Sequence, residues 1–519
     1  MATEIVATTA SGKLRGTRSQ GICSFKGIAY AAPTSGETRF RAPAPATPWA
    51  GVRDALQWGP RCPQERETYG DAPIFPWYAQ TEGFNEDCCV LNVYTPGLDD
   101  GRRPVMVYVH GGGYVTGGGG GDVLDGSQLA AFGDVVVVTL NHRLNVFGYT
   151  NLGALDPDTF PDAANAGMLD IVAALQWIQT HIATFGGDPG RVTLFGQSGG
   201  GSKIMVLMGM PAARGLFHRA INMSGTSGTR VAPSDSTRDY VSRLLHHLGL
   251  ADAGPEALRA LPVDALLWAR RLALQDCPEG ARPVVDGRHI TGSPMDPQCL
   301  ANHASVPLML GTAATEATFH FGSDDRHLAL TRRQVLDRLM RQFGLDEEQA
   351  GALMMQFRRD DPARSDSDVL IALITETLYR GPMMAAADAK ARAGKAPVYL
   401  YNFAWRSPVE GGRWGTPHAM DIPFAFGTID KASAITAGAP AAASVSRTLM
   451  SAFVAFARDG KPDNPSMPAW QPYDSHARAT MVIDEKCRLV EDFRRGDREA
   501  GLQVRLEPFN RSALMTYRD

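Results

Sequence analysis

The chain has 519 residues, of which 44% are hydrophobic and 20% are charged, and its formal net charge at pH 7 is −4. This composition is that of a globular protein with ample core. No basic run is present, so no nucleic-acid partner is expected, and no apolar stretch reaches the roughly 18 residues of a membrane-spanning helix. Seven cysteines and the absence of a visible secretory signal favour a cytoplasmic protein over a disulfide scaffold.

The first half of the chain predicts strands that alternate with helices. A hairpin over 5–16 and a strand at 22–28 are expected first. They are followed by strands at 91–95, 105–109 and 135–140, the last a continuous apolar run of the kind found in a sheet covered on both faces. Residues 169–185 have apolar side chains at helical spacing. This alternation predicts a parallel or mixed α/β sheet.

The second half predicts further strands and longer helical regions. Strands are expected at 220–224, 307–310, 398–403 and 481–484, and the last of these is expected to be the final strand. Helices are expected at 234–280 with caps such as Ser234 and Asp264, at 331–395 with a break at Asp360-Asp361-Pro362, and at 447–459. The chemical motifs described below spread from residue 110 to residue 418. We therefore expect one catalytic domain over 1–519, with a helical insertion at about 331–395.

One stretch predicts a nucleophile. The apolar run 192–195 leads into Gly196-Gln197-Ser198-Gly199-Gly200, and a helix is expected from about 200 to 210. Strand, sharp turn and helix together form a nucleophile elbow, which holds a serine hydroxyl clear of the backbone. Ser198 is therefore the candidate nucleophile. The pentapeptide alone also fits a glycine-rich loop, because the chain contains 54 glycines.

A serine hydroxyl needs a base and an orienting acid, which in elbow enzymes follow in the order acid, then histidine. His418 follows the strand at 398–403 in a loop rich in glycine and proline, and His320 is its rival. Glu316, just after the strand at 307–310, is the candidate acid. The alternatives in the interval include Asp286, Asp324 and Asp325.

The segment His110-Gly111-Gly112-Gly113 follows the strand at 105–109 and matches a pattern that supplies oxyanion donors. We expect the amides of Gly112, Gly113 and Gly199 to donate to one oxygen. The alternative is a flexible glycine-rich turn. No HExxH or CxxC motif is present, and 117–121 lacks the Lys-Ser/Thr of a phosphate-binding loop, so neither a metal nor a cofactor is expected.

At this point the chain resembles a type-B carboxylesterase, the branch of the α/β-hydrolases that also contains the cholinesterases. The resemblance covers nearly the whole chain and is closest in character to bacterial p-nitrobenzyl-type esterases. It rests on the segments Glu86-Asp87-Cys88, Leu91-Asn92-Val93-Tyr94-Thr95-Pro96, Asn141-His142-Arg143-Leu144 (with His142 for the usual Tyr), Phe185-Gly186-Gly187-Asp188-Pro189, Pro283-Val284-Val285-Asp286-Gly287, Gly311-Thr312-Ala313-Ala314-Thr315-Glu316 and His418 with Asp421-Ile422-Pro423-Phe424.

The resemblance implies an α/β-hydrolase fold, a central, mostly parallel sheet flanked by helices with a helical cap or regulatory insertion. It also implies a serine carboxylesterase with the triad Ser198, Glu316 and His418, Gly112, Gly113 and Gly199 as oxyanion donors, and no cofactor. In this family Ala is usual at Gly199. Ser224 is implied to support His418, although it also fits a turn serine. An amidase or lactone hydrolase with the same triad is the alternative, and a non-catalytic adhesion protein of this fold is disfavoured because every triad member is present.

Further expectations concern the surroundings of the triad. Phe75, Trp77 and Tyr114 are expected to contact the substrate; as an alternative, the aromatic residues of the loop between Cys62 and Cys88 fold inward. Cys62 and Cys88 match the family's first disulfide pair, which a reducing compartment would keep open. Ala313 and Ala317 replace the usual residues around the acid and are expected to loosen its support. The expected partner is a small-molecule ester, with no membrane partner, for a monomer or weak dimer.

Overall fold

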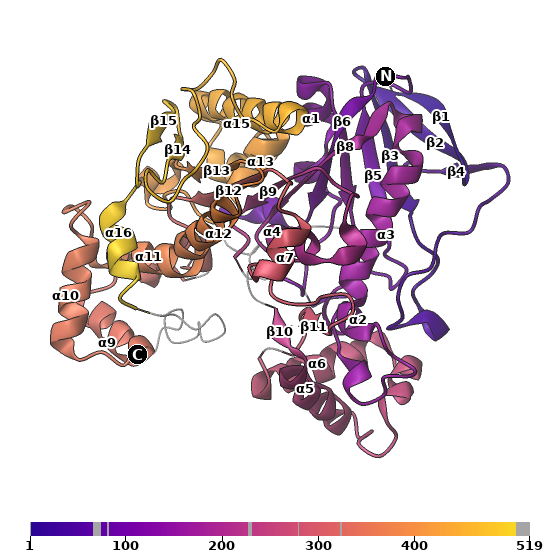
Figure 1. The fold of residues 1–519 in the computed structure, drawn as a ribbon, viewed down its shortest axis with the longest axis horizontal. Coiled ribbons are helices and arrows are strands. Elements are labelled where there is room, and N and C mark those ends of the chain that lie inside the picture. The colour runs from indigo at the N-terminus through magenta and orange to yellow at the C-terminus, as the bar shows by residue number, and fades with distance from the viewer. Residues whose placement is uncertain are drawn as a thin grey trace.

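One large sheet runs through the computed structural model, which describes residues 2–65, 74–79, 82–226, 231–278, 280–321 and 324–504, without the side chains of 235, 236 and 325. Within these residues the strand order is β1-β2-β3-β5-β7-β6-β8-β9-β12-β13-β14-β15, with β4 beside β2 (Figure 1). The strands are β1 Thr3–Thr9, β2 Gly12–Ser19, β3 Ile22–Ala29, β4 Val52–Asp54, β5 Val90–Thr95, β6 Arg103–Val109, β7 Val136–Leu140, β8 Gly187–Gln197, β9 Arg219–Met223, β12 Leu308–Ala313, β13 Val398–Phe403, β14 Thr480–Ile483 and β15 Arg488–Val490.

The centre of the sheet is parallel, as predicted. Every neighbouring pair from β7 through β6, β8, β9, β12 and β13 to β14 is parallel, whereas the pairs at both ends of the sheet are antiparallel. Successive side chains of β6 alternate between two cores: Val105, Val107 and Val109 belong to one, Met106 and Tyr108 to the other. This alternation explains the continuous apolar strands, because both faces of the sheet are covered.

Helices supply the cover. They are α1 Ser127–Gly133, α2 Asn145–Gly148, α3 Ala166–His181, α4 Gly199–Gly209, α5 Ser234–His247, α6 Val263–Asp276, α7 Pro297–Asn302, α8 Thr318–Phe321, α9 Arg332–Phe343, α10 Glu347–Phe357, α11 Asp366–Thr375, α12 Gly381–Ala393, α13 Asp421–Phe426, α14 Ser433–Thr436, α15 Pro440–Asp459 and α16 Arg495–Gly501. Figure 1 shows α9 and α10 at one side of the molecule and α5 and α6 at its lower edge, beside the short pair β10 Ala232–Pro233 and β11 Val284–Val285.

Several predicted boundaries are wrong. The strand at 481–484 is not the last, since β15 follows it, and α15 begins at Pro440 rather than at residue 447. Ser234 and Asp264 are not N-caps: the extended residues Pro233 and Pro262 precede the helices, and neither supplies a side-chain cap. Because Ser234 is already the first helical residue, its hydroxyl is not at the capping position.

The helical region predicted at 331–395 comprises α9 to α12, with the predicted break between Phe357 and Asp366. Three of its helices begin with a capping box, formed by Thr331 with Gln334, Asp346 with Gln349 and Ser365 with Asp368. A five-residue π-helical segment, Glu376–Arg380, joins α11 to α12. Such segments often occur at functional sites, and this one carries Tyr379 toward the candidate base described below.

A buried ion pair fixes the segment that follows β7. Arg143 donates to Asp170 of α3 from Nε at 2.9 Å, from Nη2 at 2.6 Å and from its backbone amide at 3.0 Å. Neither side chain is more than 2% exposed. Because a guanidinium and a carboxylate are desolvated together here, removing one charge leaves the other without compensation.

We therefore predict that Asp170→Asn destabilises the protein by about 3–5 kcal/mol, the cost of an unpaired buried charge, in urea unfolding followed by circular dichroism. Asp54→Asn is the matched control. Asp54 pairs with Arg15 at 2.6 Å on the surface, where solvent screens the pair, so no measurable change is expected. Equal effects of the two substitutions would contradict the structural role of the buried pair.

Candidate active site

Ser198 lies at the turn between β8 and α4 with φ 56° and ψ −123°. A positive φ is rare for a non-glycine residue and is maintained only where the surroundings enforce it. Here the Ser198 amide donates to the carbonyl of Met223 at 2.7 Å, and the Ser202 amide donates back to the Ser198 carbonyl at 3.0 Å. The predicted sequence of strand, sharp turn and helix is confirmed.

The glycines after Ser198 are required by close packing. A Cβ on Gly199 would overlap the backbone of Gly113, and one on Gly200 would overlap the carbonyl of Val109. The first turn of α4 is therefore pressed against the end of β6 and the loop that follows it. At Gly199, where Ala is usual in the family, the backbone of this chain leaves no space for a methyl group.

Three amides in this contact have no internal acceptor. Within the described part of the chain, the amides of Gly112, Gly113 and Gly199 donate no hydrogen bond. Gly112 and Gly113 have φ values of 82° and 63°, which open the loop toward the elbow. Unsatisfied amides at a helix N-terminus and an adjoining glycine loop are suited to bind a developing negative charge.

His418 and Glu316 lie together, as predicted. The two residues are buried, and Nδ1 of His418 lies 2.5 Å from Oε2 of Glu316. The other oxygen of Glu316 accepts from the Ser224 hydroxyl at 2.6 Å and from the Ala313 amide at 2.7 Å. Ser224 thus contacts Glu316, the hydrogen-bond partner of His418, and a supporting role for Ser224 stays a prediction. The expected loosening by Ala313 and Ala317 stays a prediction; in the structure the Ala313 backbone amide contacts the carboxylate and Ala317 is fully buried.

The rival acids and the rival base have other partners. Asp286 accepts from the backbone amides of residues 288–290, and Asp324 pairs with Arg326 at 2.7 Å. The side chain of Asp325 is outside the described residues. His320 contacts the Tyr379 hydroxyl at 2.5 Å, and its ring stacks beside His418 at 6.1 Å. Among the candidates, the pair of Glu316 and His418 is therefore the one that the fold brings to the elbow.

Nε2 of His418, the atom that would accept a proton, lies 3.1 Å from the Gln197 amide nitrogen. In the described residues no hydrogen bond joins this atom to Ser198. Catalytic hydrogen bonds are often long in structures without substrate, so this distance does not exclude His418 as the base. The contact with Gln197 places the imidazole at the residue adjacent to the serine. The His418 ring is enclosed by Phe319 at 5.5 Å and Tyr379 at 5.0 Å.

A second carboxyl group lies close to the acid. Asp421, at the start of α13, is fully buried; its Oδ1 has no partner among the described residues, and Oδ2 accepts a 3.4 Å bond from Tyr401. Burial raises the pKa of Asp421 to about 7, and the charge of Glu316 adds to the shift. Two neighbouring carboxyl groups therefore differ: Glu316 has well-placed donors, whereas Asp421 has hardly any.

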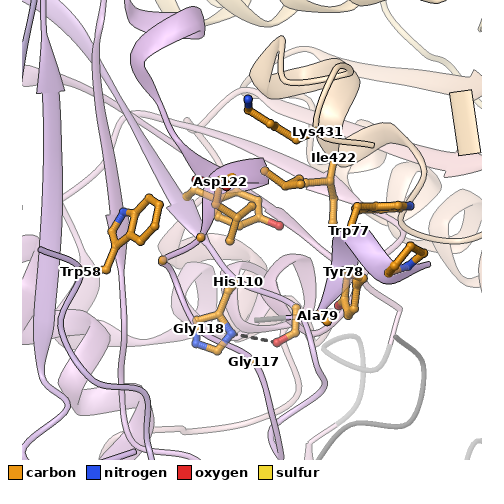
Figure 2. A pocket seen from close by; sticks show the side chains of 17 residues that line it. Trp58, Trp77, Tyr78, Ala79, His110, Gly117, Gly118, Asp122, Ile422 and Lys431 are labelled. Atoms are coloured by element: carbon orange, nitrogen blue, oxygen red, sulfur yellow. Dashed lines mark hydrogen bonds between the residues drawn. The ribbon is translucent and has the colours of Figure 1, made fainter. Parts of the chain in front are cut away.

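The predicted substrate-contacting aromatics are buried rather than exposed. Phe75 packs against Phe319 at 4.8 Å, and Tyr114 packs against Tyr149 at 5.2 Å. Trp77 lines a cavity of about 260 Å³ together with Tyr78, His110 and Gly111 (Figure 2). The aromatic rings of this loop pack inward, as the alternative has it, and Trp77 also lines the cavity. Substrate contact by Phe75, Trp77 and Tyr114 stays a prediction, and residues 66–73 and 80–81 of this loop are outside the described part.

Cys62 and Cys88 are buried free thiols, and so is the adjacent Cys89. The contact with the Cys62 thiol raises the pKa of Cys88. A disulfide between the two stays a prediction. In the described residues, no group of three or more His, Cys, Asp or Glu side chains is arranged to hold a metal, and no helix is both long and apolar enough to cross a membrane.

Sequence reasoning missed three residues of this site: Gln197, Asp421 and Lys203. Gln197 directly precedes Ser198, and Asp421 follows His418 by three residues, so their proximity to predicted triad members was the available signal. Lys203, on α4, is fully buried and donates from Nζ to the His110 carbonyl at 3.1 Å. Burial lowers its pKa to about 7. A lysine in an otherwise small and apolar helix was the signal at this position.

Known proteins resemble this chain over nearly its whole length. The family model described as the carboxylesterase family matches residues 2–500. The para-nitrobenzyl esterase of Bacillus subtilis (strain 168) is 33% identical over 498 residues, covering 94% of this chain and 97% of the relative. The phenmedipham hydrolase of Pseudarthrobacter oxydans is 33% identical over 512 residues, covering 96% and 99%.

A solved structure agrees with these relatives. The carboxylesterase EST55 of Geobacillus stearothermophilus superimposes with a TM-score of 0.82 at 32% identity, covering 95% of this chain and 99% of that one. The large, mostly parallel sheet flanked by helices is the α/β-hydrolase fold. The chain therefore belongs to the carboxylesterase family and is a serine carboxylesterase, which hydrolyses carboxylic esters.

Proposed function

We propose that Ser198 is the nucleophile of this ester hydrolase, His418 its base and Glu316 its acid, with Gly112, Gly113 and Gly199 as oxyanion donors. The observation that carries the proposal is the buried pair of His418 and Glu316 at 2.5 Å, with the opposite nitrogen of His418 directed to the residue next to Ser198. This is the arrangement that a base needs in order to accept a serine proton and be stabilised as an imidazolium.

The steps follow from this geometry. Because Nδ1 of His418 donates to Glu316, Nε2 carries a lone pair and takes the Ser198 proton as Oγ attacks the ester carbonyl. The carbonyl oxygen becomes an oxyanion at the free amides of the elbow and the glycine loop. When the intermediate collapses, His418 returns the proton to the departing alcohol. Water, deprotonated by His418, then hydrolyses the acyl-enzyme, releasing the acid and restoring Ser198.

We propose small esters with an aromatic alcohol as substrates. The rings of Phe319 and Tyr379 beside His418, and of Trp77 and Tyr78 in the neighbouring cavity, support this class. The name of one relative refers to a para-nitrobenzyl ester and that of another to phenmedipham. Amide or lactone hydrolysis by the same triad is the alternative, and rates on a matched p-nitrophenyl ester and p-nitroanilide distinguish it from ester hydrolysis.

The wider proposals concern the whole protein. We propose that residues 1–519 act as one catalytic domain with the helices of about 331–395 as an insertion, because the strands that carry the acid and the base lie on both sides of this region. We propose a cytoplasmic setting, in which the buried thiols of Cys62 and Cys88 would stay reduced. We further propose that the protein is a monomer or weak dimer that acts on a small-molecule ester. Sedimentation velocity tests the oligomeric state directly.

The first prediction concerns the nucleophile. Ser198→Ala removes the attacking oxygen, so hydrolysis of p-nitrophenyl butyrate is expected to fall to the background rate while the circular dichroism spectrum is unchanged. Ser242→Ala, an exposed serine on α5, is the control and should retain full activity. Substantial turnover by a pure Ser198→Ala preparation would refute the assignment.

The second prediction concerns the acid. Glu316→Gln loses the charge that stabilises the His418 imidazolium and its tautomer, so kcat should fall by at least about 100-fold. Asp324→Asn removes a carboxylate whose partner is Arg326, and kcat should be unchanged. Stopped-flow or steady-state assays at one pH compare the two. The opposite ranking of the variants would assign the acid to Asp324.

The third prediction follows from the raised pKa of Asp421. A carboxyl group whose pKa is about 7 in the folded protein and about 4 when unfolded keeps its proton only in the native state between these values. The stabilisation that comes from the protonated Asp421 carboxyl group is therefore complete below about pH 4. It is lost as the pH rises to 7, and the free energy of unfolding falls by up to about 1.4 kcal/mol per pH unit. Asp421→Asn removes this loss.

Accordingly, the free energy of unfolding of Asp421→Asn minus that of the wild type should rise between about pH 4 and pH 7 and level off above 7. Urea unfolding across this range measures the difference, and other titrating groups cancel in the comparison. A difference that is independent of pH would show that Asp421 is ionised in the folded protein at low pH.

A further inference from the structure

Lys203 is a buried lysine that the proposed mechanism does not use. It lies in the second turn of α4, the helix that starts at the elbow, and it is fully buried. Its Nζ donates to the carbonyl oxygen of His110 at 3.1 Å and lies 5.9 Å from the centre of the Tyr114 ring. His110 and Tyr114 stand at the two ends of the glycine loop that holds the proposed oxyanion donors.

The surroundings of Lys203 contain basic groups instead of an anion. Among the described residues, no carboxylate forms an ion pair with it. The imidazoles of His110 and His142 stack on each other at 4.8 Å. Burial, followed by the charge of Lys203, lowers the pKa of each well below its usual range. Both rings are therefore neutral, and each Nδ1 donates to the next carbonyl along the chain.

Such a lysine costs stability compared with an apolar residue of the same shape, because an ammonium group with one carbonyl acceptor is poorly compensated for its lost hydration. Lys390, the second lysine that is almost fully buried, differs in this respect. Its Nζ donates to the carbonyl of His303 and, at 3.0 Å, to that of Ala304, and so joins α12 to the segment after α7. Lys390 has an evident structural purpose, whereas Lys203 has its one hydrogen bond at the start of the oxyanion loop.

The hydrogen bond from Lys203 fixes a carbonyl at the start of a glycine-rich segment, whose backbone is intrinsically flexible. Three consecutive glycines, 111–113, follow His110, and glycine restricts backbone rotation less than any other residue. Fixing the His110 carbonyl sets the orientation of the first peptide plane of the loop. The turn beyond it is closed by the amides of Val115 and Thr116, which donate to the Gly112 carbonyl at 3.1 Å. Lys203 thus holds the end of the loop that lacks such a turn.

We propose that Lys203 is a positioning residue of the oxyanion loop: through the His110 carbonyl, its ammonium group holds the amides of Gly112 and Gly113 where the ester oxygen becomes an anion. The inference rests on the proposed roles of Ser198 and these glycines. It predicts an effect on the transition state and little effect on the bound ground state, because the oxygen is an anion only in the former.

The test is Lys203→Met, which keeps the length of the side chain and removes its charge and its donor. With p-nitrophenyl butyrate, kcat is expected to fall by about 10- to 100-fold, less than the loss of a whole oxyanion donor, while KM changes by less than about twofold. The affinity for a trifluoromethyl ketone, which forms a tetrahedral adduct, should weaken by the same factor as kcat/KM. The melting temperature should be unchanged or higher, because a poorly compensated buried charge is removed.

Lys390→Met is the matched control, with the opposite pattern: a lower melting temperature and an unchanged kcat. A Lys203→Met enzyme with wild-type kcat would overturn the proposal, as would a lower melting temperature without a loss of kcat. If the Lys203→Met variant does not fold, Lys203→Leu is tested in its place. If neither variant folds, the proposal is overturned, because Lys203 is then needed for folding. The proposed triad is tested separately, since it is refuted if the Ser198→Ala variant retains activity.

Discussion

The site depends on the close approach of one helix end to the end of a strand. The first turn of α4 contacts the backbone of Val109 and Gly113 so closely that neither Gly199 nor Gly200 has space for a Cβ. This packing holds Ser198 in a backbone conformation that costs a non-glycine residue about 1–3 kcal/mol. The same approach brings the Gly199 amide beside the glycine loop. One packing constraint therefore positions both the proposed nucleophile and its proposed oxyanion donors.

The sheet and the turn that carries Ser198 could be predicted from the sequence because their signals are local. Continuous apolar runs such as 135–140 indicate strands covered on both faces, and the glycines around Ser198 indicate a sharp turn before a helix. The resemblance to a family then favoured Glu316 and His418 over their rivals. The helix caps were predicted less well, since Pro233 and Pro262 precede the helices in place of capping side chains.

The contacts around the triad could not be predicted, because they join residues far apart in the chain. Ser224 contacts Glu316 across 92 positions, and Gln197 contacts His418 across 221. The burial of Phe75 likewise depends on Phe319, which belongs to a different part of the chain. A sequence shows which residues are capable of such contacts, whereas the fold decides which of them form.

The hydrogen bonds at the acid also explain the charges around it. Both oxygens of Glu316 have donors at 2.7 Å or less, from His418, Ser224 and the Ala313 amide. Asp421 lies in the same buried region with one donor at 3.4 Å, and its carboxyl group keeps a proton up to about pH 7. Burial with so few donors raises the pKa of Asp421, whereas the donors around Glu316 are the kind that a carboxylate needs.

The neutrality of Gln197 completes this arrangement. Its amide lies 3.1 Å from Nε2 of His418, the nitrogen that has to accept a proton from Ser198. The Gln197 amide donates to Nε2 without adding a charge beside the imidazole. Glu316 is the acidic group that contacts His418, and it does so at Nδ1, on the opposite side of the ring from Nε2.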